Sequence, residues 1–375
     1  MNAQQETVLK GFTREPWIDN VKALAILLVI IGHSTGLLAN KPDSMILFGA
    51  WIIAFNMPLF VIMAGWTSCS GFEKLTTWDS MLVYFEKLCE RTIIPSVVFS
   101  SLYAIAKGEI FSRHLWLVYF VVVGIYFLLK RLHADLRPTF YTVMRILLVG
   151  LLVLLNFPIN YFWFLVMIIQ YLAIGGLISF GMQYVKISDN LRIVFFIILF
   201  CAAVLTFCKG WVKEFPFYFV LGLLCRKYVG IDKIKSLPGW LCIVFFILGS
   251  FTVICCKSYS FYDYGIASLF TNGIPEYYII RQISGFVLSV IVIKLVYYFS
   301  KHYNEFSQFG AFSMALYMIH TQILAIWPVS IEGSTDLFCW VKLSGIVSVW
   351  TFISYSLILG LNKWVLTRKL FLGKN

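Results

Sequence analysis

The stretch Trp17-Ile-Asp-Asn-Val-Lys22-Ala-Leu-Ala-Ile-Leu-Leu-Val-Ile-Ile-Gly-His33 decides the class of fold. Ten residues without a polar side chain follow Lys22, and His33 stands inside the same apolar run, which continues to about residue 40. A run of about 20 apolar residues is the length that a helix needs to cross a bilayer. The run contains a histidine and lacks a small-residue cleavage site, so we interpret it as a membrane span and not as a signal peptide.

The composition of the whole chain extends this interpretation. Of 375 residues, 60% are hydrophobic and only 13% are charged, against about 45–50% and about 25% in ordinary globular proteins. These values exclude a cytoplasmic enzyme, a nucleic-acid binder and a secreted disulfide scaffold. They predict an all-α fold, a polytopic transmembrane helix bundle of about 10–12 spans. The expected spans are 21–40, 46–66, 92–107, 115–130, 141–157, 160–180, 192–208, 214–227, 239–256, 277–300, 310–328 and 338–362.

The net charge of +12 predicts the orientation of the chain. With these spans, twenty lysines and arginines fall on the side of the N-terminus and six on the other side, and four lie within spans. Basic residues collect in cytoplasmic loops, so we expect a cytoplasmic N-terminus and C-terminus. The expected organisation is a cytoplasmic segment over 1–20, a single transmembrane domain over 21–362 and a cytoplasmic tail over 363–375.

Polar side chains deep within spans are the first candidates for function, because they are costly in lipid. All 18 acidic residues lie outside the spans or near their ends, which leaves His33, Asn56, Gln170, His320 and Gln322 as the deep polar set. His33 follows Lys22 by eleven residues, about 16 Å along a helix, and most of the others lie at similar depth. We expect side chains from separate helices to meet there, although each one can instead be an isolated packing or hydrogen-bonding residue.

The residue types of this set favour proton transfer. Histidine exchanges a proton near neutral pH, and a deep histidine is expected to be neutral and usable as a general base. No carboxylate lies at that depth and no cluster has metal-ligand spacing. The deep polar residues therefore favour direct group transfer over a covalent serine mechanism. We also expect no metal.

Several motifs resemble those of the integral-membrane acyltransferase-3 family, in particular its fucose 4-O-acetylase-like and polysaccharide O-acetyltransferase branch. Lys22 and His33 keep the family spacing of a basic residue, ten positions and a histidine. The other similar segments are 54–66 (AFNMPLFVIMAGW), 87–95 (KLCERTIIP), 162–171 (FWFLVMIIQY), 219–222 (FVLG) and 313–320 (SMALYMIH). Three departures stand out: Asn56 replaces a usual histidine, Ala64 replaces a usual serine, and Lys87 and Arg91 are four positions apart instead of three.

The resemblance implies an O-acetyltransferase of the cell's inner (plasma) membrane that moves acetyl from cytosolic acetyl-CoA to a hydroxyl of a cell-surface or lipid-linked glycan. It implies that His33, Asn56 and His320 are catalytic and that Lys22, Lys87 and Arg91 hold the phosphates of the donor. The residues expected near substrate are Asp19, Trp163, Gln170, Arg281 and Tyr317. Without the resemblance, ordinary positive-inside charge is the preferred explanation of the three cations. Amides can also simply join helices, and aromatic residues gather at membrane interfaces.

Two other classes stay open. A transporter or flippase for a glycan or lipid also uses deep polar residues, but it often has matching Gly/Pro breaks in its two halves, and Pro58 and Pro95 have no clear late counterparts. A structural subunit does not need two deep histidines. Binding of acetyl-CoA separates the enzyme from both. Membrane lipids and a glycan acceptor are the expected partners, and nucleic acid is not.

Overall fold

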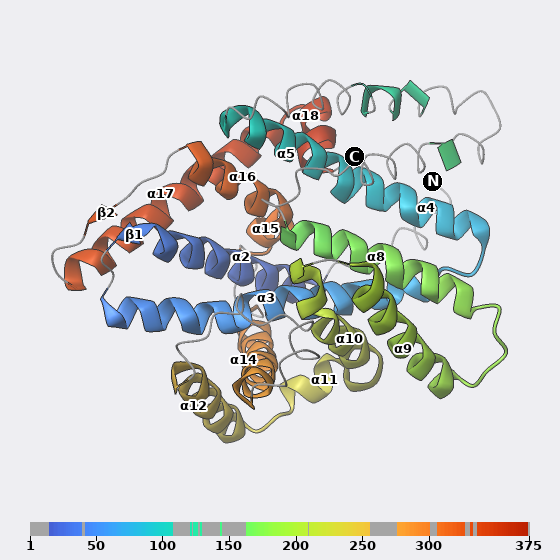
Figure 1. Cartoon of the computed structure of the whole chain (residues 1–375), viewed down its shortest axis with the longest axis horizontal. Coiled ribbons are helices and arrows are strands. Elements are labelled where there is room, and N and C mark those ends of the chain that lie inside the picture. Colours follow the sequence, from blue (N-terminus) through green and yellow to red (C-terminus); the bar gives the residue numbers. More distant parts are fainter. Residues whose placement is uncertain are drawn as a thin grey trace, which may run out of the picture.

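Two long helices, α2 (Pro16–Leu37) and α3 (Asp43–Phe72), lie side by side through the middle of the molecule (Figure 1). The computed structural model describes residues 15–39, 42–107, 163–208, 210–255, 276–300, 306–326, 331–332 and 336–373, together with short pieces between 121 and 144. Around the central pair lie α8 (Trp163–Met182), α10 (Pro216–Leu224), α14 (Glu276–Ser300), α15 (Phe306–Ala311) and α16 (Ser313–Ile326).

The remaining elements complete the bundle at its periphery and its ends. They are α4 (Trp78–Leu88), η1 (Cys89–Ile93), α5 (Ile94–Lys107), α9 (Asp189–Phe207), η3 (Gly210–Glu214), η4 (Cys225–Val229), α11 (Gly230–Lys235), α12 (Gly239–Cys255), α17 (Asp336–Asn362) and α18 (Val365–Leu372). Two short strands, β1 (Leu38–Ala39) and β2 (Ile331–Glu332), pair in parallel after α2 and before α17. Apart from this pair, the described elements are helical, which confirms the predicted all-α bundle.

Six helices in the described part of the chain are long and apolar enough to cross a membrane: Pro16–Gly36, Asp43–Phe72, Trp163–Met182, Asp189–Phe207, Gln282–Ser300 and Asp336–Asn362. The segments Pro216–Lys235 and Gly239–Ile254 meet this test only together, as a pair bent by 113°, which makes up to seven spans. A chain with this many apolar helices is a multi-pass membrane protein.

Several expected spans differ in the structure. The span expected over 92–107 becomes the end of the π-helical η1 and the 14-residue α5. The span expected over 214–227 divides among the last residue of η3, the nine-residue α10 and the first part of η4. The span expected over 310–328 is broken at Phe312, between α15 and the 14-residue α16. Hydropathy reports only how apolar a segment is, so it cannot detect these breaks. The expected spans 115–130 and 141–157 lie largely outside the described residues, and the cytoplasmic N-terminus stays a prediction.

Glycines bring the central helices close together. Gly65 on α3 faces the backbone of Phe219 on α10, and Gly222 on α10 faces the backbone of Ile62 on α3, so that a Cβ at either position would collide with a carbonyl oxygen. Small residues of this kind allow helix backbones to approach within a membrane. The close approach fixes α10 against α3, the helix that contributes Phe60, Thr67 and Ser68 to the cavity of the candidate active site.

The chain end folds back onto the early helices. In α18, which lies within the expected cytoplasmic tail, Phe371 packs edge-to-face on Phe99 of α5 with ring centroids 5.4 Å apart. Gly373 follows at φ 59° and lies against the backbone of Arg91 in η1. The short helix is therefore packed against η1 and α5.

Candidate active site

The two deep histidines meet although they are 287 positions apart in the sequence. His33 on α2 and His320 on α16 have Nδ1 and Nε2, respectively, 2.9 Å apart, which is hydrogen-bond distance. Their rings stack with centroids 5.1 Å apart. The His320 side chain is completely buried, whereas His33 is partly exposed. His33 is therefore the more accessible member of the pair.

The hydrogen bonds assign the protons of the pair. The other ring nitrogen of His320, Nδ1, lies 2.9 Å from the carbonyl oxygen of Leu316. A carbonyl oxygen only accepts, so Nδ1 of His320 carries hydrogen, and in the neutral ring its Nε2 then holds a lone pair. Nδ1 of a neutral His33 must donate to that lone pair. Nε2 of His33 is left with its lone pair available, which is the arrangement a general base requires.

Asn56 lies beside the first histidine. Its side chain is buried on α3, and its amide nitrogen would be 3.8 Å from a Cβ placed on Gly32, the residue before His33. Its Oδ1 accepts a hydrogen bond from the backbone N–H of Met57 at 2.6 Å. This bond orients the amide, so its NH₂ group is directed towards α2 and is suited to stabilise negative charge near His33.

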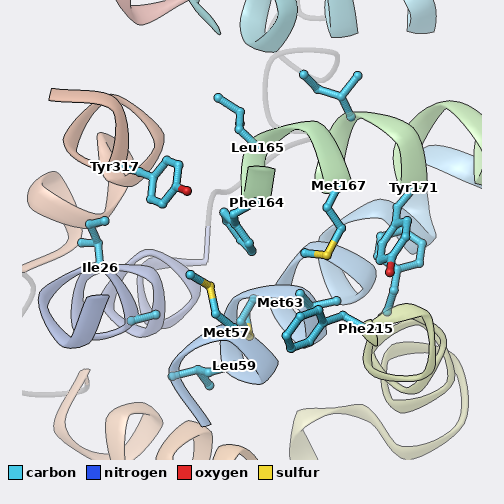
Figure 2. Packing of buried hydrophobic residues seen from close by; sticks show 14 of the residues in the cluster. Ile26, Met57, Leu59, Met63, Phe164, Leu165, Met167, Tyr171, Phe215 and Tyr317 are labelled. Atoms are coloured by element: carbon cyan, nitrogen blue, oxygen red, sulfur yellow. The ribbon is translucent and has the colours of Figure 1, made fainter. Parts of the chain in front are cut away.

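Tyr317 connects the histidines to a cavity. Its ring contacts His320, with centroids 5.6 Å apart, and also contacts Phe164 of α8 at 5.4 Å. Figure 2 shows Tyr317 and Phe164 near Ile26 of α2 and Met57 of α3, so four helices meet at this point. Tyr317 also lines a cavity of about 190 Å³ that lies among α2, α3, η1, α8 and α16.

This cavity is polar only in places. Its polar lining residues are Lys22, Thr67, Ser68, Thr92, Ser313 and Tyr317, and its other lining residues are apolar. The hydroxyl hydrogens of Thr67 and Ser68 are used within α3, where they bond to the carbonyl oxygens of Met63 and Ala64, respectively, at 2.9 and 2.6 Å. Both oxygens keep lone pairs that can accept from N–H groups. The cavity thus combines one cation with several acceptors.

The structure separates the other predicted donor-binding residues from this cavity. Lys22 lines it, whereas Lys87 on α4 and Arg91 in η1 are exposed and are not among its lining residues. Only Thr92, the neighbour of Arg91, reaches it. Asp19 is buried one turn before Lys22, where Gly310 of α15 packs on its backbone.

The remaining predicted residues lie elsewhere or outside the described part. Trp163 stacks on Phe215 with centroids 6.1 Å apart, and Gln170 on α8 has a buried Oε1 without a hydrogen-bond partner among the described residues. Gln322 donates to the carbonyl oxygen of Phe99 at 2.6 Å and so joins α16 to α5. The side chain of Arg281 lies outside the described residues, as do the neighbouring side chains at 276–278.

Sequence reasoning missed the hydroxyl groups of the cavity. Thr92 and Ser313 lie within the motifs at 87–95 and 313–320, and Thr67 and Ser68 directly follow the motif at 54–66, so their positions were a usable signal. Hydropathy alone does not single out any of the four. In the part of the chain that the structure describes, no three His, Cys, Asp or Glu side chains gather in a possible metal site.

Comparison with known proteins identifies a family. A family model described as an acyltransferase domain matches residues 15–361. No curated protein and no solved structure matches the chain. The matched range contains α2, α16 and every residue that lines the 190 Å³ cavity.

Proposed function

Because the chain belongs to the acyltransferase-3 family, we propose that this membrane acyltransferase moves an acetyl group from cytosolic acetyl-CoA to a hydroxyl of a cell-surface or lipid-linked glycan in the cell's inner membrane. The observation that carries the proposal is the contact of His33 with His320 next to a cavity that contains Lys22. A general base beside a cationic cavity is the minimum that transfer from a phosphate-bearing thioester requires.

The donor would lie along the cavity. Lys22 would hold a phosphate of acetyl-CoA, and the lone pairs of Thr67 and Ser68 would accept from the amide N–H groups of its pantetheine arm. The thioester would then lie towards Tyr317, which contacts His320. This path would bring the reacting carbonyl to Tyr317, whose ring contacts His320, the hydrogen-bond partner of His33. It does not use Lys87 or Arg91, whose exposed positions suit a first electrostatic contact with the donor.

The acetyl group would pass directly from the thioester to the acceptor hydroxyl, without a covalent acyl-enzyme. Nε2 of His33 takes the proton of the acceptor hydroxyl while its oxygen attacks the thioester carbonyl carbon. The carbon–sulfur bond breaks, the proton passes to the sulfur, and an ester and free CoA result. His320 accepts the Nδ1–H bond of His33 throughout, and the Asn56 NH₂ group stabilises the oxyanion that forms on the carbonyl oxygen.

Replacement of His33 tests the proposal. We expect His33→Ala to abolish the base-labile acetyl esters that mass spectrometry detects on the glycans of cells producing the protein, and to stop CoA release by the purified protein. Removing a general base of this kind costs roughly 10²–10⁴-fold in rate.

Ser34→Ala provides the matched control. Ser34 is the next residue and is equally within α2. Among the described residues, its hydroxyl donates to the carbonyl oxygen of Ile30 in its own helix, at 2.7 Å. We expect this variant to keep its acetylation at equal protein level. Full acetylation by His33→Ala at equal protein level would contradict the mechanism.

A further inference from the structure

A second cavity lies away from the histidines, where several helices end. It has a volume of about 280 Å³ and lies among the ends of α3 and α8, the start of α9 and the end of α10. The bond from Ser179 of α8 to the carbonyl oxygen of Phe72, the last residue of α3, joins two of these ends at 3.2 Å. Helix ends at one level mark the boundary between hydrocarbon and headgroups in a membrane protein, so the cavity lies at that boundary.

The walls of this cavity are apolar. Phe72, Phe196 and Val220 contribute from three helices, and the other apolar lining residues continue the same surface. On the outer side of α9, Val194 and Ile198 are about half exposed, as expected of a helix that faces lipid. The cavity is therefore next to the lipid-facing surface of the bundle, where an acyl chain can enter it.

The polar lining residues carry both signs of charge. Arg192 and Lys227 supply two cations, and Glu73 supplies a carboxylate. Nη1 of Arg192 pairs with Asp189 at 3.2 Å, but its buried Nε has no hydrogen-bond partner among the described residues. A buried donor without a partner is costly, so an acceptor oxygen in the cavity would stabilise the protein. Ser179 and Gln183 add further oxygen atoms to the same lining.

We infer that this cavity binds a phospholipid whose head carries a phosphate and a primary ammonium, that is, phosphatidylethanolamine. The phosphate accepts hydrogen bonds from Arg Nε and Lys Nζ, and the ammonium donates to the carboxylate and to the neighbouring oxygens. One acyl chain lies on the apolar wall. A purely anionic head leaves Glu73 opposed to negative charge, and a trimethylated head has no N–H group to donate. The inference does not depend on the proposed function.

Native mass spectrometry of the full-length protein in detergent tests this site. The protein is mixed with equal amounts of phosphatidylethanolamine, phosphatidylcholine and phosphatidylglycerol with identical acyl chains. We expect several-fold more phosphatidylethanolamine than either other lipid to stay bound. Equal retention of the three lipids by the unchanged protein would overturn the inference.

Two sets of variants separate the roles of the charges. Glu73→Gln is expected to keep phospholipid bound but to lose the preference for phosphatidylethanolamine, and an unchanged preference would contradict the assignment. The double variant Arg192→Gln/Lys227→Gln is expected to lose all three lipids, whereas Arg192→Lys/Lys227→Arg keeps them. Lys186→Gln is the matched control, because Lys186 is an exposed cation between α8 and α9 that does not line the cavity.

A last arm distinguishes lipid from a soluble phosphate compound. Coenzyme A is added to the lipid-bound protein at increasing concentration. We expect the bound lipid to stay. Displacement of phosphatidylethanolamine by coenzyme A in the unchanged protein would assign the cavity to a soluble phosphate ligand and overturn the lipid site.

Discussion

At the scale of single residues, the orientation of one imidazole ring determines whether His33 can act as a base. His320 donates from Nδ1 to the carbonyl oxygen of Leu316 and accepts at Nε2 from His33. This chain of bonds keeps hydrogen on Nδ1 of His33 and the lone pair on Nε2. A ring without this partner can adopt the other tautomer, in which Nε2 carries hydrogen and cannot accept a proton.

We therefore expect His320→Ala to reduce kcat by about 10³–10⁴-fold, because a wrong tautomer at a catalytic histidine has an effect of that order. His320→Gln restores an acceptor oxygen and is expected to recover part of the loss. Nitrogen-15 NMR of labelled protein reports the tautomer directly: hydrogen should be on Nδ1 of His33 in the unchanged protein and shift towards Nε2 in His320→Ala. An unchanged tautomer in that variant would contradict the assigned role.

At the scale of helices, the contact between α3 and α10 shows how the site is held. Gly65 and Gly222 let the two backbones touch, and the same part of α3 contributes Thr67 and Ser68 to the cavity. The predicted span 46–66 is present here within α3, whereas the predicted span 214–227 is here mainly the nine-residue α10. The sequence therefore located both helices but not the short length of the second. Their contact depends on which side of each helix carries the glycine, and a uniformly apolar helix does not reveal that.

We expect Gly65→Ala to lower the stability of the protein by about 1–3 kcal/mol, because the added Cβ collides with the carbonyl oxygen of Phe219. Gly71→Ala on the same helix is the control. A Cβ there meets nothing within 4 Å, so this change should stabilise the helix by up to about 1 kcal/mol. Thermal unfolding of both variants in the same detergent measures the difference, and equal midpoints would show that the close approach is unimportant.

At the scale of the whole molecule, the orientation in the membrane decides which side supplies the donor. The lysine and arginine count predicts a cytoplasmic N-terminus, which places the connection between α8 and α9 inside and the start of α3 outside. Ser44 and Val185 are exposed positions at these two places. Cysteines introduced at both positions therefore provide a direct test.

We expect a membrane-impermeant maleimide to label Ser44→Cys in intact cells and to label Val185→Cys only after the membrane is permeabilised. The unchanged protein, which contains nine cysteines, gives the background. The reverse labelling pattern would show that the N-terminus is not cytoplasmic. It would then contradict the proposed access of cytosolic acetyl-CoA to Lys22.

The sequence by itself determined that most of the chain lies in lipid, that its fold is helical, and how deep its polar residues lie along their helices. Backbone groups in lipid must be satisfied within a helix, so a chain of long apolar runs has few alternatives. Depth follows from the rise per residue, which is why His33 and His320 were expected at one level. The family spacing of Lys22 and His33 could also be recognised in the sequence, because both residues lie on one continuous helix.

Only the tertiary structure decided which of these residues meet. Contact between His33 and His320 depends on the rotation of α2 and α16 about their axes, which glycine contacts and side-chain packing set across hundreds of residues. The same packing placed Gln322 against α5 instead of in the site and left Lys87 and Arg91 exposed. Breaks such as the one at Phe312 also escape prediction, because an interrupted apolar helix has the same composition as a continuous one.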